Sequence, residues 1–193
     1  MMRTATFLIC VLFVTACAVS EPPPPKAAEN RYFLALTPKS LGRNLSLSQL
    51  VTGEFGGNTY RARYEVEIIG DRLTIVGLSP IGLTLFTLIQ SGDAVTMDSR
   101  LKEAAGFDPR YTLFDLYLSY WPAEVLERAL EQNGLTLDVD ARNSSRTVLD
   151  ADGRTVATVT YPPGRNPGGA TVIAHVEPPY RLRILPLNAP GQK

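Results

Sequence analysis

Cysteine and histidine are almost absent from this sequence. Its 193 residues include two cysteines, Cys10 and Cys17, and one histidine, His175. Cys10 lies in an N-terminal segment that we expect to be removed, so Cys17 keeps no partner for an internal disulfide. A metal site or a nucleophile–histidine pair would have to be built around His175 alone. We therefore expect no metal, no cofactor and no enzymatic activity, and we interpret His175 as an ordinary strand histidine.

An excess of charge of either sign is also missing. The chain carries 19 basic and 19 acidic side chains, and the basic residues form no cluster along it. Binding to nucleic acid needs a basic surface that neutralises phosphates, so we expect no nucleic-acid partner. The same balance argues against strong electrostatic attachment to anionic lipid.

Long apolar runs occur in only two places, and the first is the start of the chain. Met1 to Ala16 has an early Arg3 followed by ATFLICVLFVTA, which is typical of a secretory signal and too short for a stable spanning helix. It ends in Val14-Thr15-Ala16-Cys17, which resembles the bacterial lipobox. The resemblance implies that residues 1–16 are removed and that Cys17 becomes an acylated first residue. The alternative is that Cys17 is one more apolar signal residue and cleavage falls later.

Acylation would also set the location of the protein. Each buried methylene contributes about 0.8 kcal/mol, so several acyl chains hold a protein on a membrane almost permanently. In lipoprotein families an Asp directly after the Cys retains the protein at the inner membrane. Here that residue is Ala18, so the resemblance implies the outer membrane, with the domain facing the periplasm. Residues 17–30 contain four consecutive prolines and predict a semi-rigid tether, followed by a single domain over 31–193.

The second apolar run, Leu73 to Gln90, is divided by a turn. It is almost long enough to cross a bilayer as a helix, but Ser79-Pro80-Ile81-Gly82 at its centre is turn chemistry. We predict strands at about 73–78 and 83–90 with Ile81 at the tip between them. Both strands are apolar on both faces, so we expect a cover on each face. Ile81 is either exposed at the tip or folds back into the core.

The rest of the chain has mainly β periodicity. Between Tyr60 and Ile68, apolar residues alternate with Arg and Glu, which predicts a strand with one buried and one exposed face. A helix is expected at 122–133, where Pro122 opens an apolar stripe. Together the patterns predict a mainly β (α+β) domain: one curved antiparallel sheet, or half-open β-barrel, of roughly 9–11 strands with a helical insertion on its concave face. Further strands are expected in a hairpin over 146–161 and at 170–177 and 180–187.

The segment Pro109 to Tyr120 is aromatic and apolar without a clear period. Core packing is the favoured interpretation. Two alternatives stay open: stacking on a cofactor or sugar, and the lid side of a lipid-sized cavity. The aromatic residues concerned are Phe107, Tyr111, Phe114, Tyr117, Tyr120 and Trp121.

The turn Leu78-Ser79-Pro80-Ile81-Gly82, with an apolar strand after it, resembles a hairpin of the outer-membrane lipoprotein receptor LolB. In that family the turn reads Asn/Gly-Pro-Leu-Gly, and its Leu protrudes and helps to insert acyl chains into the membrane. By position this Leu corresponds to Ile81, framed by Pro80 and Gly82. The chain after the signal is also similar to a family of small bacterial lipoproteins of unknown function, often encoded near aryl-polyene or fatty-acid synthesis genes. The stretches that carry this likeness are Gly42 to Glu54, Gly77 to Phe86, Phe107 to Ala123 and Pro178 to Ile184.

The resemblance implies a LolA/LolB-like fold and a binding function. We expect an outer-membrane lipoprotein, monomeric, that binds an acyl or polyene-type chain, or the acyl groups of a lipoprotein, and helps deliver it to the outer membrane. Its partners would be membrane lipid and a lipoprotein or lipid carrier. The alternative is an accessory lipoprotein that docks a partner of a lipid or polyene synthesis or export system. Pro80, Ile81 and Gly82 are the expected membrane-insertion residues, and the expected cavity lining is Tyr60, Tyr64, Val66, Leu83, Leu85, Phe114, Tyr117, Trp121 and Leu126.

The lipobox generates a direct prediction. Mass analysis of protein extracted from its own membrane should find an acylated N-terminus at Cys17. Cys17→Ala removes the thiol that accepts the lipid, so this variant should appear free in the periplasm or stall before processing. A wild-type protein that is soluble and unmodified would contradict the lipoprotein interpretation.

Overall fold

The computed structural model describes residues 33–100, 109–140, 142, 145–166 and 168–188. The expected signal segment, Cys17 and the tether lie outside the described residues, as does Phe107, so what we expect of them stays a prediction. Within the described residues no helix is long and apolar enough to cross a membrane.

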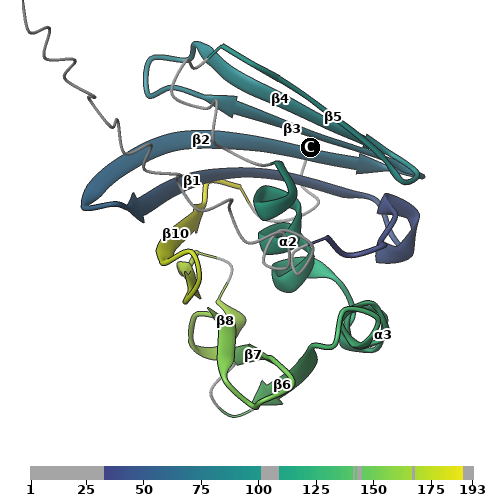
Figure 1. The fold of residues 1–193 in the computed structure, drawn as a ribbon. Helices are drawn as coiled ribbons and strands as arrows, with labels where there is room; N and C mark the ends of the chain where they lie inside the picture. Colours follow the sequence, from purple (N-terminus) through teal and green to yellow (C-terminus); the bar gives the residue numbers. More distant parts are fainter. Residues whose placement is uncertain (1–32, 101–108, 141, 143–144, 167, 189–193) are drawn as a thin grey trace, which may run out of the picture.

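Ten antiparallel strands form one curved sheet (Figure 1). The chain forms two meanders, β1 to β5 and β6 to β10, which are joined where β1 pairs with β10. β5 and β6 lie at the two edges, so the sheet is open, and the predicted half-open antiparallel sheet is confirmed. The strands are β1 Leu45–Phe55, β2 Asn58–Ile69, β3 Arg72–Leu78, β4 Thr84–Ser91, β5 Ala94–Ser99, β6 Thr136–Asp140, β7 Ser145–Leu149, β8 Thr155–Thr160, β9 Thr171–His175 and β10 Tyr180–Pro186.

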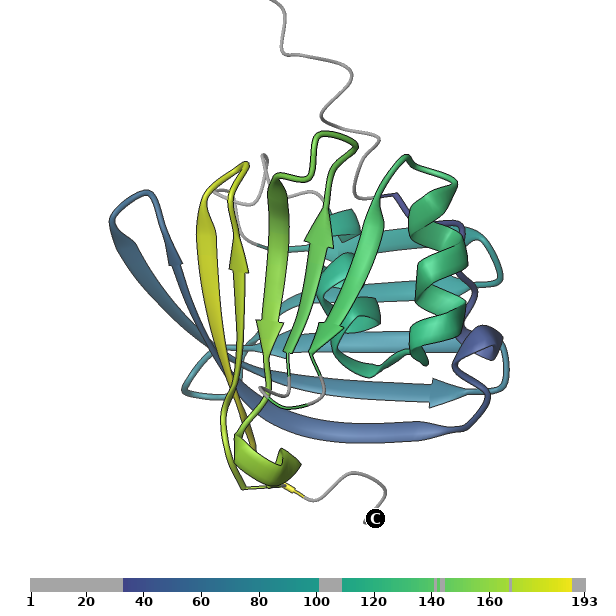
Figure 2. The ribbon, with the colours of Figure 1, turned by 90° about the horizontal axis from the view of Figure 1, so that it is seen from below.

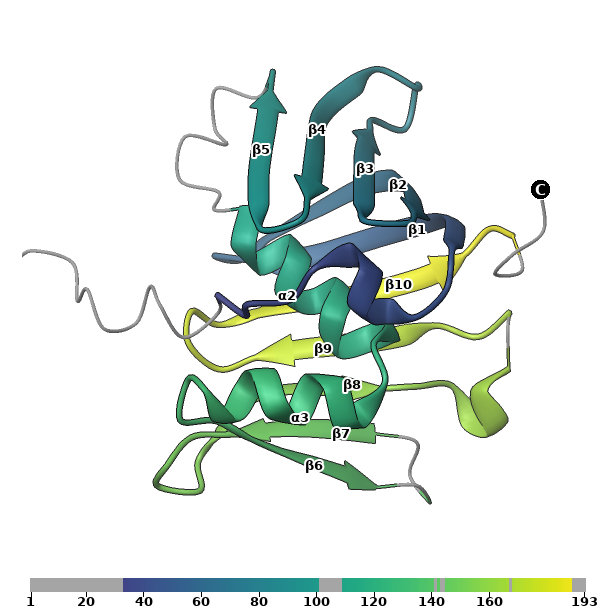
Figure 3. The same ribbon diagram turned by 90° about the vertical axis from the view of Figure 1, so that its right-hand side faces the viewer.

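Two α-helices connect the meanders and lie within the curve of the sheet (Figures 2 and 3). They are α2, Pro109–Tyr120, and α3, Ala123–Glu131. The helix expected at 122–133 is confirmed as α3, which buries its apolar stripe of Leu126, Ala129 and Leu130. The described residues also include two short 3-10 helices, η1 Pro38–Leu41 and η3 Pro163–Arg165.

Helix α2 was not predicted because it is buried on nearly every side. All residues from Thr112 to Ser119 are buried, including the polar Asp115. A helix that lies on a surface shows an apolar stripe with a 3.6-residue period, whereas a helix buried all round shows none. Its aromatic residues Phe114 and Tyr117 belong to the core, so the core-packing interpretation of the segment is confirmed for them.

The alternation in β2 is confirmed in part, since Tyr64 on the inner face and Glu65 and Glu67 on the outer face are half-buried. Val66 and Ile68 are buried on the inner face, and Arg61 is exposed on the outer face. Tyr60, which we expected to be buried, is 59% exposed. The reason is that β3 pairs with β2 only from Arg63 onward, so the end of the β1–β2 hairpin extends past its neighbour.

The cover expected on both faces of β3 and β4 is incomplete. Their inner side chains, such as Ile75 and Leu88, are buried. On the outer face Val76 and Ile89 are only half-buried. The pair therefore behaves as part of a sheet with one principal core face.

Gly77 in β3 makes room for an aromatic ring. It pairs with Phe86 of β4, and a methyl group at Gly77 would overlap ring carbon Cε1 of Phe86. The Phe86 ring also meets the Tyr64 ring edge-on, with 5.3 Å between the ring centroids. A glycine here lets the ring lie flat across the strand, as aromatic residues do over glycines in designed sheets.

We predict that Gly77→Ala lowers the free energy of unfolding by about 1–3 kcal/mol because the added methyl overpacks against the ring. Adding Phe86→Leu should recover part of this loss, a coupling that a double-mutant cycle in urea measures. Gly53→Ala in β1 is the matched control, since its methyl would meet only the flexible end of Leu182 at 3.2 Å. Equal stability of Gly77→Ala and wild type would show that the ring does not need the glycine.

Candidate functional site

The β3–β4 turn is tightly hydrogen-bonded. Ser79 organises it: its backbone N–H donates to the Leu83 carbonyl at 2.8 Å, and its carbonyl accepts from the Gly82 N–H at 2.9 Å. Its hydroxyl accepts from the Leu83 N–H at 3.0 Å. Pro80 fixes one backbone angle, and Gly82 adopts a φ of 84°, a left-handed conformation that favours glycine. The turn is therefore stiff.

This stiff turn presents two branched apolar side chains to solvent. Ile81 is 81% exposed and Leu83 is 62% exposed. The alternative in which Ile81 folds back into the core is wrong. The structure thus brings Pro80, Ile81 and Gly82 together at a protruding tip, as the sequence predicted, and adds Leu83 beside them.

Helix α2 is bonded to the first meander through two tyrosines. The Tyr117 hydroxyl donates to Oε1 of Gln90 in β4 at 2.7 Å, and Nε2 of Gln90 donates to the Leu36 carbonyl at 2.6 Å. The Tyr120 hydroxyl donates to Oε1 of Gln49 in β1 at 3.2 Å. These bonds tie the helix, the sheet and the segment before η1 together.

The second meander also bonds to the C-terminal end of the helix. Nη1 of Arg146 in β7 donates to the carbonyls of Leu118 and Trp121 at 2.7 and 2.9 Å. The Tyr161 hydroxyl lies 3.1 and 3.0 Å from the carbonyls of Leu118 and Ser119. The last carbonyls of a helix have no partner within the helix, and these side chains satisfy them in the core.

His175 belongs to a buried cluster with Asp115 and Tyr180. Its Nε2 lies 2.7 Å from Oδ1 of Asp115 in α2, and its ring stacks on Tyr180 with 4.1 Å between centroids. The Tyr180 hydroxyl donates to the same carboxylate at 3.1 Å. His175 is thus a buried residue at the end of β9 that hydrogen-bonds through Nε2. Among the described residues no three His, Cys, Asp or Glu side chains gather as metal ligands.

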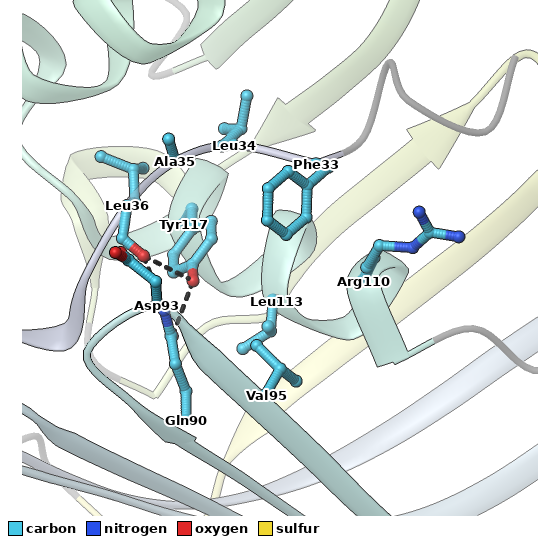
Figure 4. Close-up of a pocket in the computed structure, with 10 residues that line it drawn as sticks. All are labelled: Phe33, Leu34, Ala35, Leu36, Gln90, Asp93, Val95, Arg110, Leu113 and Tyr117. Carbon is cyan, nitrogen blue, oxygen red and sulfur yellow. Dashed lines mark hydrogen bonds between the residues drawn. The ribbon is translucent and has the colours of Figure 1, made fainter. Parts of the chain in front are cut away.

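A pocket of about 260 Å³ lies between α2, the β4–β5 hairpin and the segment before η1. Figure 4 shows the bonds among Leu36, Gln90 and Tyr117 at one end and Arg110 at the other end, its guanidinium turned away from them. The remaining wall is mainly apolar. The pocket is lined by Phe33, Leu34, Ala35, Leu36, Gln90, Asp93, Val95, Arg110, Leu113 and Tyr117.

Of the side chains expected to line a cavity, Tyr117 lines this pocket. Phe114, Trp121 and Leu126 are fully buried in the core, as is most of Val66. Tyr64 and Leu85 are half-buried against the core, and Tyr60 and Leu83 are exposed. Sequence reasoning missed the wall formed by Phe33 to Leu36; its signal was the apolar group Tyr32-Phe33-Leu34 directly after the tether.

The buried tyrosines of α2 resist ionisation. Burial raises the pKa of Tyr117 well above its usual range, its hydrogen bond with Gln90 opposes this, and Asp93 adds to it. Burial raises the pKa of Tyr120 to about 12, with a smaller upward effect of Tyr161 and a downward one of Arg43. Both hydroxyls are therefore neutral donors at physiological pH.

The structure is therefore an open antiparallel sheet with a small apolar pocket and a protruding apolar turn. The chain belongs to the DUF3261 family of proteins of unknown function, whose model matches residues 46–188. No curated protein matches it.

Two solved structures are similar to this chain. One is a LolA superfamily protein from Nitrosomonas europaea, with a TM-score of 0.46 and 8% identity, covering 84% of this chain and 90% of that one. The other is a domain provisionally described as an outer membrane lipoprotein-sorting protein from Vibrio parahaemolyticus, with a TM-score of 0.41 and 9% identity, covering 87% of this chain and 93% of that one. Identities this low say nothing about function.

The tyrosines predict how stability depends on pH. In the unfolded chain tyrosine loses its proton near its ordinary pKa of about 10, whereas Tyr120 keeps it to about 12 in the fold. The unfolded state therefore binds fewer protons between these values, and the free energy of unfolding falls as pH rises above about 10. Tyr120→Phe should make this fall shallower in urea titrations between pH 9 and 12. Tyr60→Phe, which changes an exposed tyrosine, is the matched control. If the free energy of unfolding falls equally steeply with pH for Tyr120→Phe and for wild type, Tyr120 is not the cause of the fall.

Proposed function

We propose that this protein is an outer-membrane-anchored, non-catalytic lipoprotein that binds one hydrophobic chain of the acyl or polyene type and helps deliver it to the outer membrane. The observation that carries the proposal is Ile81, which is 81% exposed at the tip of a stiff turn. Leaving such a side chain in water forgoes roughly 1.5–3 kcal/mol of burial. Membrane hydrocarbon or a bound chain would supply that burial.

The size and the lining of the pocket suit a narrow apolar ligand. Its volume of about 260 Å³ is just below the range of roughly 300–1,000 Å³ that is common for drug-sized ligands. This size suits a single chain better than a lipid with several. Gln90 and Tyr117 at one end already bond to each other, so a hydrocarbon ligand leaves neither of these two side chains unsatisfied, and Asp93 beside them is exposed to water.

The pocket lies next to the expected tether, a position that fits a membrane-anchored protein. Its wall begins at Phe33, just after the expected tether at residues 17–30. A chain held in this pocket would lie where the domain joins its link to the membrane.

Docking of a protein partner is the second candidate function. The observation that favours it is the filled concave face, where Phe114, Trp121 and Leu126 have no exposed surface. In this alternative Ile81 and Leu83 contact a partner protein instead of lipid. Chain transfer then does not depend on the turn.

The test compares two exposed isoleucines. Ile81→Glu and Ile69→Glu both change a residue at a hairpin end, and Ile69 is 58% exposed. We predict that both variants melt close to wild type, because neither side chain contributes much to the core. Only Ile81→Glu should lose transfer of a fluorescent fatty acid to liposomes, because moving a carboxylate into hydrocarbon costs several kcal/mol.

The control separates the turn from a general effect of added charge. Ile69→Glu should transfer at the wild-type rate. A folded Ile81→Glu that also transfers at the wild-type rate would contradict a role of the turn in delivery and favour docking.

A further inference from the structure

The outer face of the sheet gathers arginines that lie far apart in the sequence. Thr52 of β1 pairs with Arg61 of β2 on one side and with Arg183 of β10 on the other. Arg183 in turn pairs with Val172 of β9. These residues alternate with the buried Val51 and Ile184, so the row lies on the face opposite the helices.

A shallow groove of about 320 Å³ follows this row. It is lined by Thr52, Glu54, Val172, Arg181 and Arg183. Arg181 and Arg183 are two residues apart on one strand, so both guanidinium groups rise from the same face. Thr52 places a hydroxyl between Arg183 and Arg61.

The arginines of this groove have few carboxylates near them. Arg63, their neighbour on β2, is paired with Glu65 at 3.0 Å. Within the described part of the chain, no ion pair or side-chain hydrogen bond engages Arg61, Arg181 or Arg183. Glu54, opposite Arg181 in the register, is the one carboxylate that lines the groove. Two arginines and one carboxylate thus line the groove, and Arg61 lies on the same face, on the neighbouring strand β2.

We propose that this groove, defined by Thr52, Glu54, Val172, Arg181 and Arg183, binds a phosphate-bearing anion, either a free phosphate or the phosphate of a lipid headgroup. Guanidinium groups donate in a fixed fork that matches phosphate oxygens, and such charge-assisted bonds are strong. Phosphate has enough acceptor oxygens for Arg181, Arg183 and the Thr52 hydroxyl together. Glu54 opposes the anion and limits its affinity. This site is separate from the apolar pocket and does not depend on the proposed function.

The test titrates two probes against the full chain. Inorganic phosphate is followed by shifts of backbone amide signals in β1 and β10. Vesicles of phosphatidylglycerol and of phosphatidylcholine are compared by co-sedimentation with the Cys17→Ala chain, in which no lipid anchor obscures the result. Binding of inorganic phosphate supports a free-phosphate source. Preference for phosphatidylglycerol vesicles supports a headgroup source.

Variants decide whether the groove is responsible. Arg183→Gln should weaken binding of the effective probe by about tenfold, the loss expected for one hydrogen bond to a charged group. Glu54→Gln should strengthen binding, a gain that misfolding cannot produce. Arg128→Gln, which removes an exposed arginine from α3, is the matched control and should leave affinity unchanged. The proposal is overturned if neither probe binds, if Arg183→Gln binds as wild type, or if Arg128→Gln weakens binding equally.

Discussion

Hydrogen bonds from both meanders fix helix α2 in the hollow of the sheet, and the rest of the structure depends on this. Gln49 and Gln90 reach it from the first meander, and Arg146 and Tyr161 from the second. A buried polar group without a partner is costly, so this set of bonds favours one position of the helix over others of similar apolar contact. Within the sheet itself, the two meanders are joined through the β1–β10 pair.

The position of α2 also decides where a ligand can go. The helix and its aromatic residues fill the middle of the concave face, where Phe114 and Trp121 are fully buried. Space remains at the side, between α2, Phe33 to Leu36 and the β4–β5 hairpin. The apolar turn at Ile81 lies outside this packed region, so changes there leave the core intact. Stability and proposed delivery are therefore carried by different residues, which makes them separable by mutation.

Local chemistry was enough to predict much of the fold. Period-2 alternation located β2, and turn residues located the β3–β4 tip at Ile81, because both signals lie within a few neighbouring residues. Helix α2 could not be predicted in this way, because a helix buried on all sides has no apolar stripe with a 3.6-residue period. Relations between distant segments were also out of reach: Asp115 contacts His175 through helix placement, and Arg61 and Arg183 lie on either side of Thr52 through strand order. The predicted cavity lining assumed that the helix at 122–133 covers a lipid-sized cavity, whereas α2 and its aromatic residues fill that space.

Native mass spectrometry of the protein, extracted from its own membrane in mild detergent, tests the central claim most directly. The account predicts a population that retains one single-chain amphiphile, released when the protein is denatured. The proposal places this one chain in the pocket of about 260 Å³. Protein that is consistently empty under these conditions, with its N-terminal modification intact, would contradict carriage of a hydrophobic chain and leave docking as the better account.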